Sequence, residues 1–378
     1  MKNLLGWRVT PRSTATLAKW ALNKSISAAQ MMGLSTLLYG ALACSATLAQ
    51  AEETQSPEPK GYIALLLPGN AKAFKPAVDN IRTGVLAAER VHGDADIPLV
   101  RVFDTTDKEE DIQAQYKKAV AGGASAVIGP LTKSALNYLA DSTELTVPVL
   151  ALNGFDQTTL AQSKLYSFGL GIEGDAIAAA QLMKLEGVQQ PIVLQTADST
   201  GQRLTPSFVA SWRALTGAEP VIVTIANPKR DAPALKAQLA EAVTDAIFLA
   251  MDAKAARIIR PFLGNERAVY ATSQVNPGRL PTTMLVDLTG IKYLDMPWLA
   301  NPNQEGYELY NRTRSTSNDL ERLFALGVDA WQIAAILAKG GTVERLEGLT
   351  GTLSLGPDNV VAREMTVRTM GRTETPRE

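Results

Sequence analysis

The sequence alternates short apolar runs with amphipathic segments, and this alternation constrains the fold more than any other feature. Four apolar runs, at 62–69, 98–104, 124–130 and 147–154, are separated by segments with helical spacing of apolar residues. The runs are apolar throughout rather than at every second residue, which is typical of parallel strands buried on both faces. We therefore predict an α/β fold with helices on both faces of a parallel sheet.

The pattern restarts after residue 189. Residues 190–217 repeat the strand, polar loop and helix of residues 62–93, and more strands are expected at 219–225, 245–252 and 268–274. We predict two doubly wound lobes of similar plan. The predicted division is a signal peptide at 1–51, a linker at 52–61, a first lobe at 62–168 plus 270–325, and a second lobe at 169–269 plus 326–378.

The order becomes irregular after Ser273. We expect a strand and a Pro-Trp loop within 285–302, one strong helix at 320–341, and a hairpin at 349–367. The turn of that hairpin is predicted at Gly356-Pro357-Asp358-Asn359.

The first 51 residues have the composition of an export signal. They contain five Lys or Arg and no Asp or Glu, and an uncharged, mostly apolar run extends from Met31 to about Ala49. Cleavage after Ala51 would release a free periplasmic protein. Acylation of Cys44, in "ALAC", would instead tether the protein to a membrane, and an uncleaved leader would anchor it. The sequence leaves these three alternatives open.

The remaining chain carries 32 Lys and Arg against 38 Asp and Glu, a net charge of −6. This argues against a nucleic-acid partner, which requires basic patches. Contact with a membrane is expected only through the lipid or the leader. Because Cys44 is the single cysteine, no internal disulfide can form.

Several segments resemble one family. The strand ends "LLLPG" and "VIGPLTKSA", the segment "PIVLQTADSTGQR" and the hairpin "LTGTLSLGPDN" look like a type 1 periplasmic binding protein. The segments "VYATSQVN", "DLTGIKYLDMPWLANP" and "RLFALGVDAWQI" are more specific, and they resemble the LppC family of penicillin-binding protein activators.

This resemblance implies a two-lobed periplasmic protein, usually an outer-membrane lipoprotein. It also implies a class A penicillin-binding protein as partner and stimulation of peptidoglycan cross-linking. The better-known members carry an N-terminal helical-repeat domain before the binding-protein-like one, and we expect this chain to lack it. Ser45, after the cysteine, differs from the Asp associated with inner-membrane retention, so a lipidated form would be expected at the outer membrane.

Catalysis is not expected. His92 is the only histidine, so no Ser-His or Cys-His pair and no histidine zinc cluster can form. The motifs G-x-S-x-G and S-x-x-K with K-T-G are absent, and "GPLTKS" lacks the glycine of a phosphate loop. We expect no cofactor and no metal, and a structural role for His92.

Ligands of open α/β sheets bind beyond the carboxyl ends of the strands. That rule selects the polar and glycine residues of six strand ends as candidates for a ligand cleft between the lobes. For Thr132, Ser134 and Ser199 the alternative role is helix capping. The cleft candidates are Gly69, Asn70, Gly129, Thr132, Lys133, Ser134, Asn153, Asp198, Ser199, Asp252, Ser273 and Gln274.

The segment "DMPWLANP" is the candidate partner surface. Met296 and Trp298 are apolar and flanked by prolines, as at an interaction hot spot. The alternative is that Trp298 is part of the core.

Two functions remain. The first is a non-catalytic activator of a class A penicillin-binding protein. The second is a solute-binding receptor that closes on a small-molecule ligand between its lobes.

Overall fold

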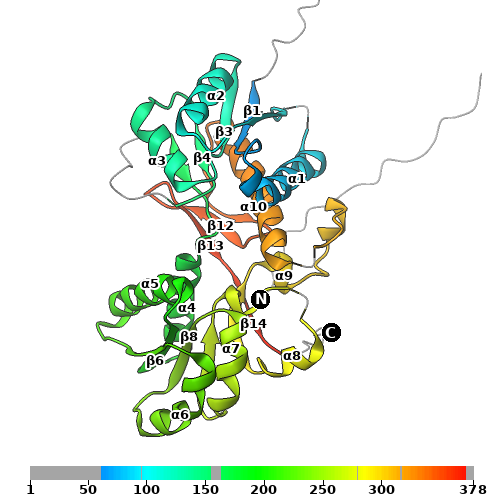
Figure 1. Cartoon of the computed structure of the whole chain (residues 1–378). Coiled ribbons are helices and arrows are strands. Elements are labelled where there is room, and N and C mark those ends of the chain that lie inside the picture. Colours follow the sequence, from blue (N-terminus) through cyan, green and yellow to red (C-terminus); the bar gives the residue numbers. More distant parts are fainter. Residues whose placement is uncertain (1–60, 95, 155–162, 279, 316, 372–378) are drawn as a thin grey trace, which may run out of the picture. The chain divides into compact units, whose positions relative to one another are not determined.

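The computed structural model describes residues 61–94, 96–154, 163–278, 280–315 and 317–371 (Figure 1). The predicted signal peptide and nearly all of the predicted linker, with Cys44, lie outside the described residues. Within these residues no helix is both long and apolar enough to cross a bilayer.

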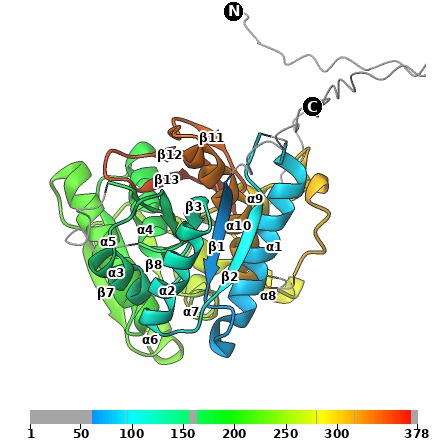
Figure 2. The ribbon, with the colours of Figure 1, turned by 90° about the horizontal axis from the view of Figure 1, so that it is seen from above.

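The first sheet has five parallel strands in the order β2-β1-β3-β4-β5. Alternate residues of β1 face opposite layers: Ile63 packs with α1 and α10, and Ala64 packs with α2 and α3. Figure 2 shows these layers on either side of β1. The elements are β1 (Tyr62–Leu67), α1 (Lys75–His92), β2 (Val100–Asp104), α2 (Glu109–Ala121), β3 (Ala124–Ile128), α3 (Lys133–Ser142), β4 (Val149–Ala151), β5 (Leu165–Ser167) and α10 (Asn318–Ala338).

The second sheet has six strands in the order β14-β10-β9-β8-β6-β7, of which only β14 is antiparallel to its neighbour. Helices α4 and α5 cover one face, and α6 and α7 cover the other. The elements are α4 (Ile172–Leu185), β6 (Pro191–Thr196), α5 (Ser199–Thr216), β7 (Val221–Ile225), α6 (Pro228–Glu241), β8 (Ala246–Ala250), α7 (Ala253–Ile259), β9 (Ala268–Ala271), β10 (Ile291–Asp295) and β14 (Thr366–Thr369).

A small antiparallel sheet completes the fold. It contains β11 (Leu346–Glu347), β12 (Thr352–Leu355) and β13 (Val361–Glu364). Met365 alone separates β13 from β14, so one stretch of chain serves the small sheet and the second sheet. The short elements are η1 (Lys72–Phe74), η3 (Arg260–Phe262), η4 (Ser273–Val275), α8 (Thr282–Val286), α9 (Pro297–Ala300) and η5 (Tyr307–Tyr310).

These elements confirm the predicted α/β class with two parallel sheets. The hairpin is also present, with its turn at the expected residues between β12 and β13. Strands β5 and β14 were not anticipated, because β5 has three residues and β14 carries no turn signal of its own.

The predicted division of the C-terminal part is wrong. The division at residue 270 cut β9 in two and placed β10 in the first lobe, whereas both strands belong to the second sheet. Helix α10, which the division at residue 325 cut in two, packs in the core of the first sheet from Phe324 to Leu337, on both sides of that division. The helix is continuous and apolar on nearly all sides, so a single core must surround it.

Helices α1 and α10 approach each other closely because each has a glycine at the crossing. A Cβ atom on Gly84 would lie 2.1 Å from the carbonyl oxygen of Phe324, and one on Gly327 would lie 2.2 Å from the carbonyl oxygen of Ile81. Any larger residue would therefore push one backbone away from the other.

Helix α10 also holds the β11–β12 loop through Asp329, whose side chain is fully buried. Its carboxylate accepts hydrogen bonds from the backbone N–H groups of Leu349 (2.8 Å) and Thr350 (2.7 Å) and from the Thr350 hydroxyl (2.6 Å). Burial raises the pKa of Asp329 to about 6, and the hydrogen bonds oppose this shift only partly.

The glycine contact predicts a large effect of one methyl group. Gly327→Ala should lower the free energy of unfolding by about 1–3 kcal/mol, since the added atom overpacks a backbone contact. Gly174→Ala is the matched control, because Gly174 lies in helix α4 with nothing within 4 Å of its Cβ position. It should be neutral or stabilise the protein by up to about 1 kcal/mol. Equal effects of both changes in urea unfolding would contradict the close-approach argument.

Asp329 predicts a rise in stability on mild acidification. A carboxyl with a raised pKa binds its proton more tightly in the folded state, so its contribution to stability increases as pH falls from about 6 toward its ordinary value of 3.8. Between pH 7 and pH 5 this gain should be about 1 kcal/mol. Asp329→Asn should remove this part of the pH dependence of urea unfolding, whereas Asp319→Asn, which changes an exposed carboxyl, should leave it in place.

Candidate functional site

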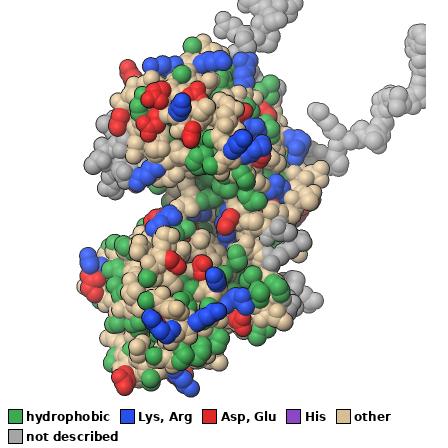
Figure 3. Space-filling model, viewed as in Figure 1, with side chains coloured by type: hydrophobic (Ala, Val, Ile, Leu, Met, Phe, Trp, Pro, Cys, Tyr) green, Lys and Arg blue, Asp and Glu red, His purple; other side chains and the backbone are tan. Residues whose placement is uncertain are grey.

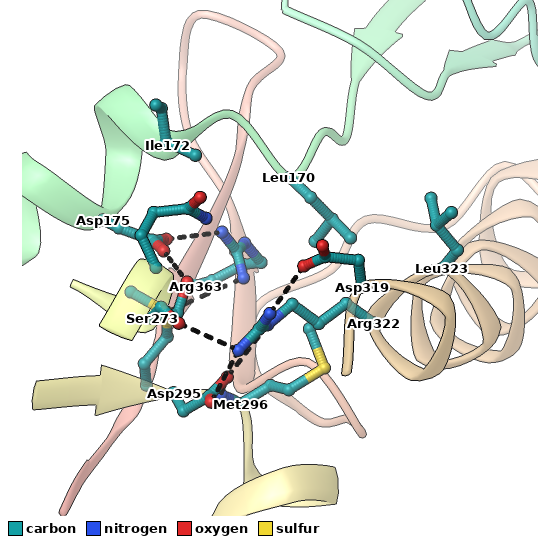
Figure 4. Close-up of a pocket in the computed structure, with 12 residues that line it drawn as sticks. Leu170, Ile172, Asp175, Ser273, Asp295, Met296, Asp319, Arg322, Leu323 and Arg363 are labelled. Atoms are coloured by element: carbon teal, nitrogen blue, oxygen red, sulfur yellow. Dashed lines mark hydrogen bonds and ion pairs between the residues drawn. The ribbon is translucent and has the colours of Figure 1, made fainter. Parts of the chain in front are cut away.

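A cavity of about 200 Å³ lies where the chain passes between the two sheets. Its residues come from the start of α4, the ends of β9 and β10, the first turn of α10, and the β13–β14 connection (Figure 4). They are Leu170, Ile172, Asp175, Ser273, Gln274, Asp295, Met296, Asp319, Arg322, Leu323, Arg363 and Met365.

Arg322 is the most connected side chain of the cavity. Its guanidinium binds both carboxylate oxygens of Asp295, with Nη2–Oδ2 at 2.9 Å and Nε–Oδ1 at 3.3 Å. It also donates to Asp319 Oδ1 at 2.9 Å and to the backbone oxygens of Ser273 and Asn276, each at 3.1 Å. Arg322 therefore joins the N-terminal end of α10 to the ends of β9 and β10.

Ser273 connects this group to a second ion pair. Its hydroxyl donates to Asp175 Oδ2 at 2.6 Å, and Arg363 Nη2 donates to Asp175 Oδ1 at 3.4 Å. Arg363 has one further weak contact, from Nη1 to the sulfur of Met365 at 3.8 Å. Two arginines and two buried aspartates thus balance each other, and Arg363 is held more loosely than Arg322.

Burial raises the pKa of Asp175, although Arg363 and the Ser273 hydroxyl act in the opposite direction. Burial is the largest single influence on the pKa of Arg322, and it lowers that pKa. The charge of Asp295 and its hydrogen bond with Arg322 act in the opposite direction, and the pKa is raised overall. Both effects follow from enclosing charges in a space from which water is largely excluded.

The chemistry of the cavity is that of ion pairs beside an apolar wall. Leu170, Ile172, Met296, Leu323 and Met365 form the wall. Within the described residues no group of three or more His, Cys, Asp or Glu side chains is arranged to hold a metal ion. A small polar or anionic molecule could bind here only by displacing the hydrogen bonds and ion pairs that the polar side chains of the cavity make with one another.

Of the twelve predicted cleft residues, Ser273 and Gln274 line this cavity. Thr132 and Ser134 line a separate cavity of about 180 Å³ near Pro68 and Thr105. The other eight line neither cavity, so the structure does not bring the twelve residues together at one site.

Of Thr132, Ser134 and Ser199, for which capping was the alternative role, only Thr132 caps a helix, whereas Asp198 and Asp252 cap helices without having been expected to. The side chain of Thr132 accepts from the N–H of Ala135, and that of Asp252 accepts from the N–H of Ala255. Asp198 accepts from the N–H groups of Thr200 and Gly201. Ser199 is the first residue of α5, and Lys133 is the first residue of α3. Burial acts to raise the pKa of Glu173, but the hydrogen bond with Arg203 and, more weakly, the charge of Lys133 lower it.

The remaining candidates shape the backbone of the first sheet. A Cβ on Gly69 would lie 1.9 Å from Asp104 Oδ1, which pairs with Arg82, and Gly129 has a positive φ of 108°. Asn70 donates to the backbone oxygen of Asp104, and Asn153 donates to that of Leu131. These contacts are internal to the first sheet.

The predicted partner surface at Met296 and Trp298 is wrong. Their exposed fractions are 2% and 1%, so a partner cannot reach them on the described surface. The Trp298 ring packs on Tyr307 and Phe324, and its Nε1–H donates to Glu321 Oε2 at 2.9 Å. The alternative, a core position, describes Trp298 correctly.

His92 also has the structural environment expected for it. Its Nε2 lies 2.8 Å from the Tyr310 hydroxyl, and its ring stacks on Trp331. Burial lowers the pKa of His92.

The sequence analysis missed the charged residues of the cavity. Asp175 and Arg322 stand within apolar helices, and Arg363 stands in the hairpin. Asp295 ends strand β10, which lies within the strand region expected at 285–302, but the strand-end rule was applied only to the six strands before it. A charge inside an otherwise apolar run was the signal, because a buried charge requires a partner.

The family model described as "LppC putative lipoprotein" matches residues 46–240 and 232–371. The chain belongs to the LppC family. Among curated relatives, the penicillin-binding protein activator LpoA of Haemophilus influenzae is 30% identical over 284 residues, covering 72% of this chain and 48% of that protein. LpoA of Photobacterium profundum is 29% identical over 340 residues, covering 80% and 54%. The chain therefore spans about half the length of the curated relatives it matches.

Solved structures give a consistent result. The C-domain of Haemophilus influenzae LpoA, titled as a regulator of PBP1A, matches with a TM-score of 0.70 and 28% identity, covering 82% of this chain and 97% of that one. A "putative branched-chain amino acid ABC transporter" of Chromobacterium violaceum matches with a TM-score of 0.71 and 33% identity, covering 82% and 100%. The matched part of the chain thus corresponds to the C-domain of Haemophilus influenzae LpoA.

The Arg322–Asp295 pair predicts a strong effect of removing one charge. Arg322→Met should lower the free energy of unfolding by about 3–5 kcal/mol, because it leaves the carboxylate of Asp295 buried without its cation. Asp319→Asn removes the exposed partner of the same arginine and should cost less than about 1 kcal/mol. Similar losses for both variants in urea unfolding would show that the buried pair has no special weight.

Proposed function

We propose that this protein is a non-catalytic activator of a class A penicillin-binding protein and promotes peptidoglycan synthesis by protein contact. One observation carries the proposal: the chain covers 97% of a solved C-domain that is titled as a regulator of PBP1A. The curated relatives are named as activators, which supports the same function.

The cavity favours an activator over a solute receptor. A receptor needs convergent polar groups that are free to bind its ligand. Here the guanidinium of Arg322 and the carboxylates of Asp175 and Asp295 are bound to one another. In the proposed function this group stabilises the connection between the sheets, and a small ligand is not needed for the activity.

The contact surface is proposed to lie outside the cavity. Acidic and basic side chains are interspersed on the face shown in Figure 3, so charge alone does not mark the docking site on that face. The proposed mechanism is allosteric. The activator binds one conformation of the synthase's peptidase domain more tightly and so shifts the synthase toward its active state.

The proposed location is the periplasm, with a tether to the outer membrane if Cys44 is acylated. The description of the family as a lipoprotein family supports the tether, and "AQA" at residues 49–51 supports cleavage to a free form. The mass of the mature protein distinguishes them, because acylation retains Cys44 and adds lipid, whereas cleavage after Ala51 leaves Glu52 as the first residue.

The test is a binding titration paired with an enzymatic assay. The full chain, purified as the cell processes it, is titrated against a detergent-solubilised class A penicillin-binding protein from the same cell, and the peptidoglycan cross-linking rate is measured at each concentration. Saturable binding with an increased rate is expected. A monofunctional penicillin-binding protein in the same detergent is the control and should show neither effect.

Absence of binding up to about 100 µM, a concentration at which even weak specific contacts are detectable, would overturn the proposal. Binding without a change in the cross-linking rate would contradict the activating role.

A further inference from the structure

The cavity of about 180 Å³ near Pro68 and Thr105 is built by the first sheet alone. Its walls come from the ends of β1, β2 and β3 and from the starts of α2 and α3. Strands β2 and β3 both run parallel to β1, so the helices that follow them begin at the same edge of the sheet. Both helices cover one face and pack against each other, which brings their first turns to this cavity (Figure 1).

One buried hydroxyl in this cavity lacks a hydrogen-bond partner. Thr105 follows the last residue of β2 and has an exposed fraction of 1%. Its backbone N–H donates to Leu67 at 2.8 Å and its backbone oxygen accepts from Asn70 at 3.0 Å, but no described residue is bonded to its hydroxyl. The preceding residue, Asp104, pairs with Arg82 of α1, so the alternation of the strand directs Thr105 to the opposite face, where the cavity lies. A buried polar group of this kind requires a partner, and a ligand in the cavity would supply one.

Further polar groups around Thr105 are free to bind. The carboxylate of Asp107 and the hydroxyl of Ser134 also line the cavity, and neither has a bonding partner among the residues that the structure describes. The Thr132 oxygen accepts a long bond of 3.4 Å from the N–H of Ala135, which leaves its own O–H available as a donor. The cavity therefore offers three hydroxyl groups and one carboxylate.

The charge of the lining favours an uncharged ligand. None of the described residues that line the cavity is Lys, Arg or His, and Asp107 contributes a negative charge. Glu109, Glu110 and Asp111 lie in the first turn of α2, where they balance the positive end of the helix dipole. An anion would have no cation to pair with here, whereas a ligand rich in hydroxyl groups could both donate to the carboxylate and bond the threonines.

The rest of the lining is apolar. Leu66, Ile112 and Ala135 are buried, and the ring of Phe74 is partly buried. The cavity volume is about six times the roughly 30 Å³ that one water molecule occupies in the liquid, which is space for a single small ring. An apolar wall with a few convergent polar groups is the usual composition of a small-molecule site.

We propose that this cavity binds one uncharged N-acetylated sugar ring, of the N-acetylglucosamine type. The ring hydroxyls bond to Thr105, Thr132 and Asp107, and the acetyl methyl group packs on the apolar wall. A free sugar and the end of a glycan strand present the same chemistry. The inference stands on the cavity and does not rest on the proposed activating function.

The test is a titration of the full chain with N-acetylglucosamine, measured by calorimetry and by saturation-transfer NMR. A dissociation constant of about 0.1–1 mM is expected for a ligand of this size. The acetyl methyl protons should receive the strongest saturation, because they lie against the apolar wall. Glucose, which lacks the acetamide, and leucine, which is charged, should each bind at least about tenfold more weakly.

Two threonine variants form a matched pair. Thr105→Val removes the free hydroxyl and should weaken sugar binding about tenfold. It should not lower the melting temperature, since the hydroxyl has no partner in the described part of the protein. Thr205→Val is the control: its hydroxyl is also buried without a described partner, but it lies in α5, on the second sheet, and the change should leave sugar affinity unaltered. Asp107→Asn, at the exposed carboxylate, should weaken binding about fivefold.

Three results would overturn the proposal: no sugar binding up to about 20 mM, unchanged affinity in Thr105→Val, or leucine binding more tightly than the sugar. A disaccharide fragment of a peptidoglycan strand distinguishes the two sources. Tighter binding of the disaccharide than of the single sugar would support the site with a strand end as its ligand, and equal or weaker binding would support it with the free sugar. A chain that activates the synthase but binds no sugar would overturn this inference and leave the proposed function in place.

Discussion

The backbone contact between α1 and α10 is the constraint on which the rest of this structure depends. Gly84 and Gly327 let the two helices meet without side chains between them. This close approach fixes α10 in the core of the first sheet, where fourteen of its twenty-one residues are buried. A helix held so firmly can carry charged residues at low solvent exposure, because the positions of their partners are fixed in advance.

Two of those charged residues determine how the remaining chain is arranged. Arg322, near the start of α10, holds the ends of β9 and β10 through Asp295 and two backbone oxygens. Asp329, two turns later, holds the β11–β12 loop through two backbone N–H groups. The glycine contact fixes the position of α10, and α10 in turn places Arg322 at the cavity between the two sheets. This explains why its polar groups are bound to one another.

The sequence predicted the alternation of strands and helices well, because buried parallel strands have an unmistakable apolar pattern. It predicted the cavity poorly. Ser273 and Gln274 were found by the strand-end rule, whereas Asp175, Arg322 and Arg363 were not, because periodicity records which face is apolar and does not record which charges meet across distant segments. Trp298 shows the same limit: Pro-bounded apolar residues are common to hot spots and to cores, and burial alone separates the two.

The single residue between β13 and β14 has a mechanical consequence. Strand β13 is paired with β12, and β14 is paired with β10, so Met365 connects two ladders that belong to different sheets. A strand cannot stretch by more than a fraction of its length, since its backbone is already extended. A load that pulls β14 along its axis away from β13 is therefore transmitted through Met365 to the β12–β13 ladder.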